Sequence, residues 1–189
     1  MIVPRIESAR LVLRGWTLAD LEPFAAMNAD PQVMEHFPST LSHQQSDELV
    51  DWIVADFERD GFGLWALEVR ETAEFIGFTG LSVPSFEALF TPAVEIGWRL
   101  AKSAWGNGFA TEAATAALDF GFNQTRLSEV VSFTSVTNLR SQAVMHRLGM
   151  TRNSADDFEH PNIQIGHRLR PHVLYRMSRE LWTLQRADS

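Results

Sequence analysis

Residues 94–122 constrain the fold of this chain more than any other stretch. The stretch begins with the short apolar run Val94 to Leu100, which is typical of a strand, and it ends with the alanine-rich run Ala110 to Phe122, which has high helix propensity. Between them stands Gly106-Asn107-Gly108, which cannot be the interior of a helix. Glycines let backbone N–H groups approach a ligand, and the first turn of a helix presents unpaired donors. The stretch therefore predicts a strand, a loop suited to the anionic oxygens of a pyrophosphate, and a helix.

The glycine loop does not match two common phosphate-binding motifs. No Gly-Lys-Ser/Thr follows it, which argues against a Walker A loop, and its glycine spacing differs from the dinucleotide fingerprint. A tight turn that merely starts a helix would use the same residues, and a glycine pair alone favours that simpler interpretation by about two to one. The rest of the sequence has to decide between the two.

The remaining chain alternates short apolar runs with helical patterns. Thr17 and the Ser42/Gln45 capping box predict the starts of two helices, and Gly61 predicts the end of the second. Asn138 predicts the start of a further helix, which Gly149 ends. The other expected elements are a strand at Leu11 to Leu13, a hairpin of Leu64 to Val69 with Phe75 to Leu81, a strand at Val130 to Val136, a helix at Leu139 to Leu148, a polar loop at Asn153 to Arg170, and a last strand at His172 to Met177.

Composition restricts the class of protein. A chain of 189 residues with 45% apolar content predicts one compact domain over residues 1–189. It has no cysteine, so disulfides and cysteine nucleophiles are excluded, and no run approaches the roughly 20 apolar residues that cross a bilayer. We therefore expect a cytoplasmic protein. The net charge of −8 disfavours binding to DNA and mildly favours a cationic substrate such as a protonated amine.

Two segments together carry a resemblance to a known family. Trp105 to Ala110 resembles the pyrophosphate loop of the GNAT superfamily of N-acetyltransferases, and Asn138 to Met150 resembles the helix that lies beside the pantetheine arm of the coenzyme. Nearly the whole chain follows the family order. Three further segments are similar to the branch that includes enzymes acetylating the N-termini of ribosomal proteins: Arg10 to Arg14, Asn28 to Met34, and His172 to Arg176.

The resemblance implies an α+β fold, in which helices flank a mixed, mostly antiparallel sheet. Its two middle strands, residues 94–100 and 130–136, would splay apart, and acetyl-coenzyme A would lie in the gap with its pantetheine along one strand edge. The residues implied to bind the coenzyme are Trp98, Arg99, Leu100, Gly106, Asn107, Gly108, Phe109, Ala110, Thr111, Asn138, Ser141, Val144 and Arg147.

Acetyl transfer needs an uncharged amine, a group that stabilises the oxyanion at the thioester carbonyl, and a way to stabilise or protonate the departing thiolate. Glu95, on a strand beside the gap, is the expected general base, and Glu68 on the hairpin is the reserve. Ser141, in the first turn of a helix, would stabilise the sulfur. Many family members place a tyrosine acid four residues beyond Ser141, where this chain has Met145. Ser141, a water molecule or direct loss of thiolate would then take its place.

Further residues are weaker candidates for the acceptor site. Phe37, His167 and Tyr175 lie on segments that could border an acceptor pocket, although packing or solvation explains each of them as well. The six histidines lack the spacing of a metal site, so we expect no metal.

The sequence predicts an N-acetyltransferase that moves the acetyl group of acetyl-coenzyme A to a primary amine by direct attack in a ternary complex. The amine would be a protein N-terminus or a small molecule. The alternatives are a catalytically silent coenzyme A-binding sensor or interaction module, favoured by the missing tyrosine, and a nucleotide-binding regulator. Either a monomer or a homodimer fits the sequence, and no membrane partner is expected.

Overall fold

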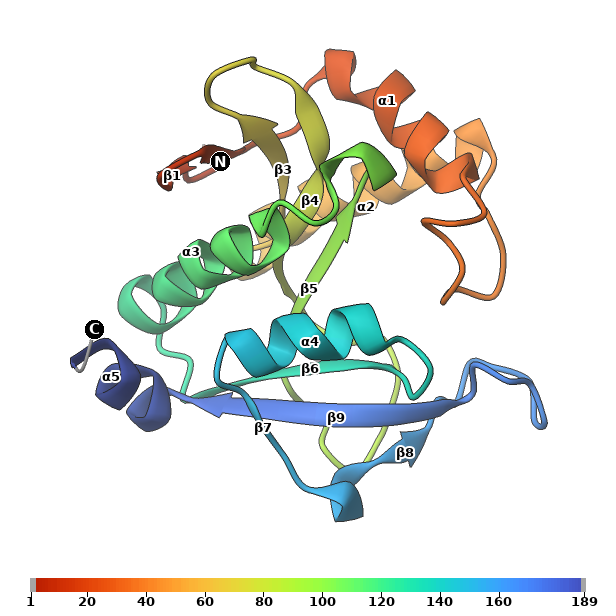
Figure 1. Cartoon of the computed structure of the whole chain (residues 1–189), viewed down its shortest axis with the longest axis vertical. Coiled ribbons are helices and arrows are strands. Elements are labelled where there is room, and N and C mark those ends of the chain that lie inside the picture. Colours follow the sequence, from red (N-terminus) through yellow and green to blue (C-terminus); the bar gives the residue numbers. More distant parts are fainter. Residues whose placement is uncertain (1–2, 188–189) are drawn as a thin grey trace.

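A mixed nine-stranded sheet runs through residues 3–187, the part of the chain that the computed structural model describes. The strand order is β1-β2-β3-β4-β5-β6-β9-β7, with β8 also paired to β9 (Figure 1). All of these pairs are antiparallel except β5 with β6. The strands are β1 (Ile6–Glu7), β2 (Leu11–Arg14), β3 (Leu64–Val69), β4 (Phe75–Ser82), β5 (Glu95–Leu100), β6 (Glu129–Ser135), β7 (Thr151–Arg152), β8 (Phe158–Glu159) and β9 (Pro171–Ser178).

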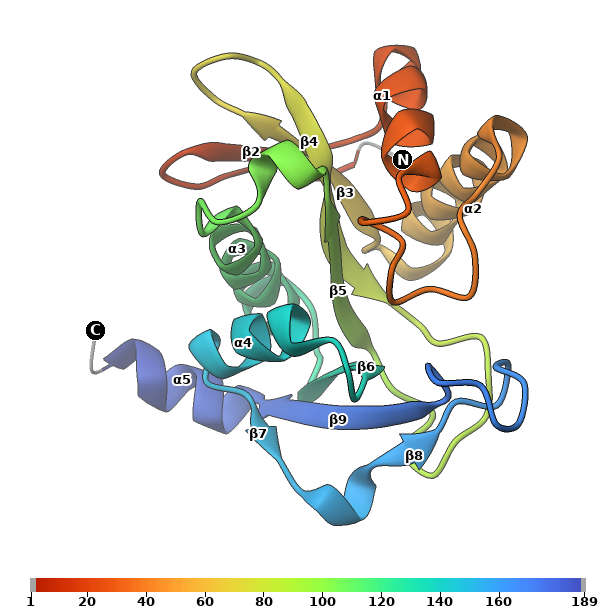
Figure 2. The same ribbon diagram turned by 45° about the vertical axis from the view of Figure 1, so that its right-hand side comes forward.

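Helices lie on both faces of this sheet. Figure 2 shows α1 and α2 on one side of the β3–β5 strands and α3 on the other, with α4 next to α3. No helix in residues 3–187 is long and apolar enough to cross a membrane. The helices are α1 (Leu18–Ala29), α2 (His43–Asp60), α3 (Phe109–Gln124), α4 (Leu139–Arg147) and α5 (Arg179–Ala187), with short 3₁₀ turns at Lys102–Ala104 and Ser154–Asp156.

The helix boundaries lie where the local sequence signals predict them. The Ser42 side chain accepts a hydrogen bond from the Gln45 N–H at 3.2 Å, and the Gln45 side chain accepts one from the Ser42 N–H at 2.8 Å, which closes the capping box of α2. Gly61 ends that helix with φ of 76°, a left-handed conformation that favours glycine. The predicted capping signals are therefore confirmed for α2.

Four elements are absent from the sequence expectations. Three of them are the strands β1, β7 and β8. Each is two residues long, which is too short to show an alternating pattern. β7 lies at the edge of the expected polar loop and β8 lies inside it. α5 follows directly on β9, and it docks through Trp182, which is buried beside Phe122 and donates a hydrogen bond to Asp119 at 3.1 Å. Its docking depends on α3, far away in the sequence.

The main core lies between the sheet and α3. Ile96 and Leu100 of β5 point into this core, where they are 0% and 6% exposed. The small alanines of α3 let the helix approach the strands closely; Ala113, Ala114 and Ala117 are each fully buried. Because side chains alternate in direction along β5, its even-numbered residues pack in the core, and Glu95, Gly97 and Arg99 lie on the opposite face.

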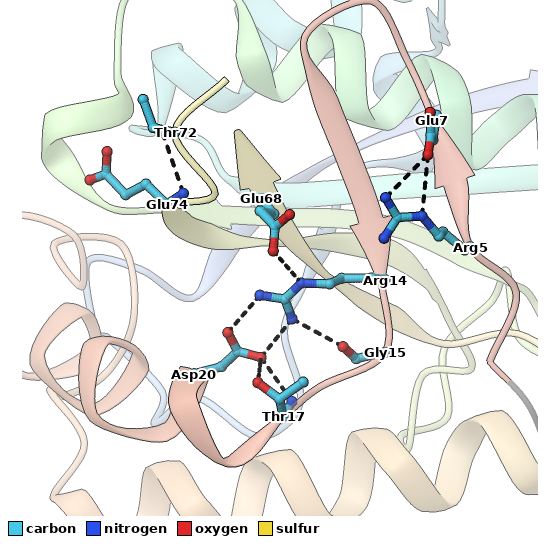
Figure 3. A network of polar contacts seen from close by, with 9 residues as sticks. All are labelled: Arg5, Glu7, Arg14, Gly15, Thr17, Asp20, Glu68, Thr72 and Glu74. Atoms are coloured by element: carbon cyan, nitrogen blue, oxygen red, sulfur yellow. Dashed lines mark hydrogen bonds and ion pairs between the residues drawn. The ribbon is translucent and has the colours of Figure 1, made fainter. Parts of the chain in front are cut away.

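An ion-pair network fastens the start of α1 to the sheet (Figure 3). Arg14 of β2 donates two hydrogen bonds to Asp20, at 2.7 and 2.9 Å, and one to Glu68 of β3, at 2.7 Å. Asp20 is 1% exposed. Burial alone would raise the pKa of Asp20, but the hydrogen bonds from Arg14 and Thr17 outweigh it, and the pKa lies below its ordinary value. The carboxylate is therefore charged and satisfied.

We predict that Arg14→Met lowers the free energy of unfolding by about 2–4 kcal/mol, because it leaves a buried carboxylate without its cation. Urea denaturation at pH 7 measures the change. Since the pKa of folded Asp20 is depressed, its contribution is present above about pH 4 and is lost as the pH falls through the lower folded value. The difference between the two proteins should therefore shrink in acid.

The exposed Arg5–Glu7 pair, also drawn in Figure 3, is the matched control. Arg5→Met should cost less than about 1 kcal/mol, because solvent screens an ion pair whose side chains are 57% and 49% exposed. Equal losses in the two variants would contradict the assignment of Arg14 as the fastening group.

Candidate active site

A cavity opens where β5 and β6 separate. The two strands pair at Glu95 and Val131 only, where the Val131 N–H donates to the Val94 carbonyl at 2.8 Å. One residue later the link is already a side chain, because the Ser132 hydroxyl donates to the Ile96 carbonyl at 2.9 Å. Beyond that point the strands diverge (Figures 1 and 2) and border a cavity of about 1040 Å³. The splayed middle strands expected from the sequence are present.

The edge of β5 offers backbone groups to this cavity. The carbonyls of Val94 and Ile96 both point toward β6. Because backbone direction alternates along a strand, the N–H and C=O of Trp98 point the same way. No β6 residue pairs with Trp98, so its donor and acceptor face the cavity. An extended ligand could hydrogen-bond here as an added strand.

The N-terminus of α3 forms a second part of the wall. Gly106 and Gly108 both have φ of 78°, and Gly108 is the N-cap residue, so no side chain caps the first turn. The N–H groups of Phe109, Ala110 and Thr111 therefore have no partner within the helix. Asn107 braces the loop by donating to the carbonyls of Ala104 and Trp105 at 3.3 and 3.2 Å. Free donors at the positive end of the helix dipole make this loop suited to an anion.

The start of α4 faces the cavity beside it. The Asn138 amide accepts a hydrogen bond from the Ser141 N–H at 3.2 Å and donates one to the Thr134 hydroxyl at 2.9 Å, so it fixes the helix start. Ser141 lines the cavity, and its hydroxyl makes no hydrogen bond to the described residues. Arg140 stacks over the Trp105 ring, with its Cζ 4.4 Å from the ring centroid. The Ser141 hydroxyl and the positive end of the α4 dipole therefore lie on the same wall of the cavity.

Glu95 lies at the apex, where the two strands begin to part. Its side chain is half-buried in the cavity wall, and it forms no hydrogen bond or ion pair with any described residue. The carboxylate leans over Gly97, since a Cβ built at that position would lie 3.9 Å from Glu95 Oε1. Burial raises the pKa of Glu95 to about 8. A carboxyl group with such a pKa can take a proton from an ammonium group near neutral pH.

Two histidines form another part of the cavity wall. His160 and His172 have ring centroids 4.9 Å apart, and both line the cavity. Burial lowers the pKa of His160 to about 4, with the neighbouring His172 and Arg170 adding to the effect, and burial also lowers the pKa of His172. Both rings are therefore neutral at pH 7. Together with Phe133 they make an aromatic, uncharged surface.

The structure brings most of the predicted site residues together. Of the residues expected to bind the coenzyme, all but Asn107 line this one cavity, as do Glu95 and Phe37. Four of the expected residues are not part of the wall. Glu68 is bound by Arg14, Tyr175 is buried with its hydroxyl 3.0 Å from His146 Nε2, the Asn107 side chain braces its own loop, and His167 accepts a hydrogen bond from the Leu169 N–H at 3.2 Å. Met145 is also fully buried, in the core.

His160, Phe133 and His172 line the cavity but were not among the predicted site residues, whereas His167 was predicted and does not line it. A signal for His172 was available, because Val173, Tyr175 and Met177 alternate into the core and place His172 on the other face of β9. His160 had no such signal, since it follows a two-residue strand in a polar segment.

Comparisons with known proteins agree with this geometry. The family model described as "Acetyltransferase (GNAT) domain" matches residues 10–151. The Bacillus subtilis protein YkkB is 33% identical over 67% of this chain and 73% of its own. The FsC-acetyl coenzyme A-N(2)-transacetylase of Aspergillus fumigatus is 28% identical over 95% of this chain and 78% of its own. The structure of Mycobacterium smegmatis RimJ in complex with CoA-disulfide shares the fold, with a TM-score of 0.76, 19% identity, and coverage of 94% and 88%.

A family model that covers about three quarters of the chain, together with a sheet that opens beside two helix N-termini, leaves one conclusion: the chain belongs to the GNAT acetyltransferases and is an acetyl-coenzyme A-dependent N-acetyltransferase.

Proposed function

We propose that acetyl-coenzyme A lies in the gap between β5 and β6. Its phosphates would accept hydrogen bonds from the free amides between Gly106 and Thr111, and its pantetheine would pair with the backbone of Trp98. Asn138, Ser141, Val144 and Arg147 would flank the arm on the α4 side. The support for this placement is that one cavity contains both sets of backbone donors and leads to Glu95 at its apex.

The acceptor is a primary amine, either a protein N-terminal α-amine or the amine of a small molecule. The observation that carries this proposal is Glu95, an unpaired carboxyl group with a pKa raised to about 8 at the point where the strands part. The name of the Aspergillus relative, an N(2)-transacetylase, is consistent with an amine acceptor.

The chemistry proceeds by direct attack. Glu95, directly or through a water molecule, takes a proton from the ammonium group, and the neutral amine then attacks the thioester carbonyl. The Trp98 N–H donates to the oxygen on which negative charge develops. When the tetrahedral intermediate collapses, the carbon–sulfur bond breaks and its electron pair leaves with sulfur. The nitrogen loses its second proton to solvent as the neutral amide forms.

The departing thiolate is stabilised at the start of α4. Ser141 can donate a hydrogen bond to sulfur, and the helix dipole favours the negative charge there. Met145 has no proton to give and is turned into the core. The proton that reaches the thiolate therefore comes from Ser141 exchanging with solvent, or from water after release.

We predict that Glu95→Gln lowers kcat by about 10²- to 10⁴-fold, because the amine loses its proton acceptor. Acetyl-coenzyme A affinity, measured by calorimetry, should change by less than about threefold. In the wild type, kcat/KM should rise with pH through a midpoint near 8, since only the ionised carboxylate is a base. Steady-state thiol release from pH 6 to 10 measures the profile.

Acceptor amines titrate in the same range, so two acceptors whose amine pKa values differ by about two units are compared. The midpoint that belongs to Glu95 stays near 8 with both acceptors and disappears in Glu95→Gln, whereas the amine midpoint moves. Glu68→Gln is the matched carboxylate control and should keep near wild-type turnover, because Arg14 holds Glu68 outside the cavity wall. A pH profile unchanged by Glu95→Gln would remove Glu95 from the mechanism.

Gly108→Trp should weaken acetyl-coenzyme A binding by more than about 100-fold, because the indole fills the space in front of the α3 amides and the phosphates lose charge-assisted hydrogen bonds. Gly61→Trp is the matched control. Gly61 has φ of 76° against 78° for Gly108, no protein atom lies within 4 Å of a Cβ built there, and the residue is not part of the cavity wall. Both variants carry the same backbone strain, so only a site effect separates them. Equal affinities by calorimetry would show that the phosphates bind elsewhere.

A further inference from the structure

Arg99 is a cation of the cavity wall with a single hydrogen-bond partner among the described residues. Its Nη1 donates to the Asn28 side-chain oxygen at 2.7 Å, and its Cζ lies 4.2 Å from the Phe37 ring centroid and 5.3 Å from that of Phe78. Nε is buried without a hydrogen-bond partner. Nη2 makes no hydrogen bond to the described residues either. One edge of the guanidinium is therefore free.

No carboxylate neutralises this cation. Arg99 forms no ion pair within residues 3–187, and Asn28, its one hydrogen-bond partner, is a neutral amide. Asn28 is itself fully buried and donates to the Ser46 hydroxyl at 3.1 Å, so its orientation is set. Burial lowers the pKa of Arg99 to about 10, and the group stays protonated at neutral pH. A positioned cation without a counterion, facing a cavity, favours an anionic guest.

Arg99 and Glu95 stand at the two ends of one strand face. They are four residues apart on β5, which places their Cα atoms about 13 Å apart. Gly97 lies between them and has no side chain to fill the space, and the Glu95 carboxylate leans over it. The Glu95 carboxyl group and the Arg99 guanidinium therefore lie at opposite ends of a part of the cavity wall that no side chain fills at Gly97.

The phosphates of the coenzyme are not the natural anion for Arg99. The residues on either side of it, Trp98 and Leu100, pack with the core under α3, and Arg99 points toward α1 and the Phe37 loop. The free amides of α3 therefore lie on the other face of the sheet. The cation belongs to the face on which the acceptor would bind.

We propose that Arg99 binds a carboxylate of the acceptor, so that the acceptor is an amino-carboxylate whose two charged groups are several bonds apart. The inference rests on the proposed function, with the amine directed to Glu95. The free Nε–Nη2 edge matches a carboxylate in a bidentate pair. Because Nε is buried, a carboxylate reaches it only if a neighbouring side chain moves. Phe37, which is 38% exposed on the α1–α2 loop and has its ring centroid 4.2 Å from Cζ, is placed to do so.

Isosteric acceptor pairs test the proposal. 5-Aminopentanoate is compared with 5-aminopentanamide, and a short peptide with an aspartate at its second position with the same peptide carrying asparagine. The wild type should prefer the carboxylate member of at least one pair by about 10- to 100-fold in kcat/KM, mainly through KM. The pair that shows the preference distinguishes a small-molecule acceptor from a peptide.

Variants test whether the preference for the carboxylate acceptor depends on the Arg99 guanidinium. In Arg99→Met the ratio of kcat/KM between the two members of the pair should fall to about one, and Arg99→Lys should retain part of the preference. Asn28→Asp is a second, independent route, because it places a carboxylate beside Nη1 and neutralises Arg99 without removing it. Arg59→Met is the control for loss of one arginine, because the Arg59 side chain on α2 is exposed and lies outside the cavity wall, and this variant should leave the preference intact.

Three outcomes would overturn the proposal: no carboxylate preference in the wild type with either pair, a preference retained in Arg99→Met, or weaker coenzyme A binding in Arg99→Met with the acceptor preference intact. Calorimetric titration of the same acceptors into protein saturated with coenzyme A measures the preference without turnover. Absence of turnover with every amine would contradict the proposed function, whereas the titration would still decide the role of Arg99.

Discussion

The structure depends on the single parallel bridge between Glu95 of β5 and Val131 of β6. A full ladder would satisfy both strand edges and close the sheet. Here the ladder stops after one pair, and the Ser132 hydroxyl donates a hydrogen bond to the next carbonyl, that of Ile96. Buried backbone donors and acceptors without partners cost free energy, so the open edge at Trp98 is stable only when water or a ligand completes it. The fold therefore contains a strand position that a substrate can occupy.

The charges of the cavity differ from those of the whole chain. The net charge is −8, yet Glu95 is the one carboxylate among the described residues of the cavity wall, where Arg99, Arg140 and Arg147 are the cations. The excess of acidic residues therefore lies outside the cavity wall. A wall with these cations suits an anionic donor, and Glu95, its single carboxylate among the described residues, is the group that we propose receives the amine.

Much of the fold follows from local signals in the sequence. The capping box at Ser42, the glycine that ends α2 and the Asn138 cap of α4 act within a few residues, and each is visible as a short pattern. The glycine loop could be predicted because a strand, a turn and a helix are contiguous there. Glu95 was chosen from the family resemblance, and the structure places it in the cavity wall. Glu68 shows the limit of this approach. Its strand position was right, but its partner, Arg14, is 54 residues away, and no local pattern reveals that the carboxylate is already neutralised.

The same alternation that builds the core also builds the site. Along β5, the even-numbered Ile96 and Leu100 are buried under α3, while Glu95, Gly97 and Arg99 face the other way. Glu95 and Arg99 lack counterions, and both therefore reduce stability. Because the pKa of folded Glu95 lies above its ordinary value, the folded state holds its proton longer than the unfolded chain does, and stability falls as the pH rises from about 4.5 to about 8. The face of β5 that carries Glu95 and Arg99 therefore lowers stability, and the packing of Ile96 and Leu100 on its other face, the Arg14 network and the buried alanines of α3 offset that loss.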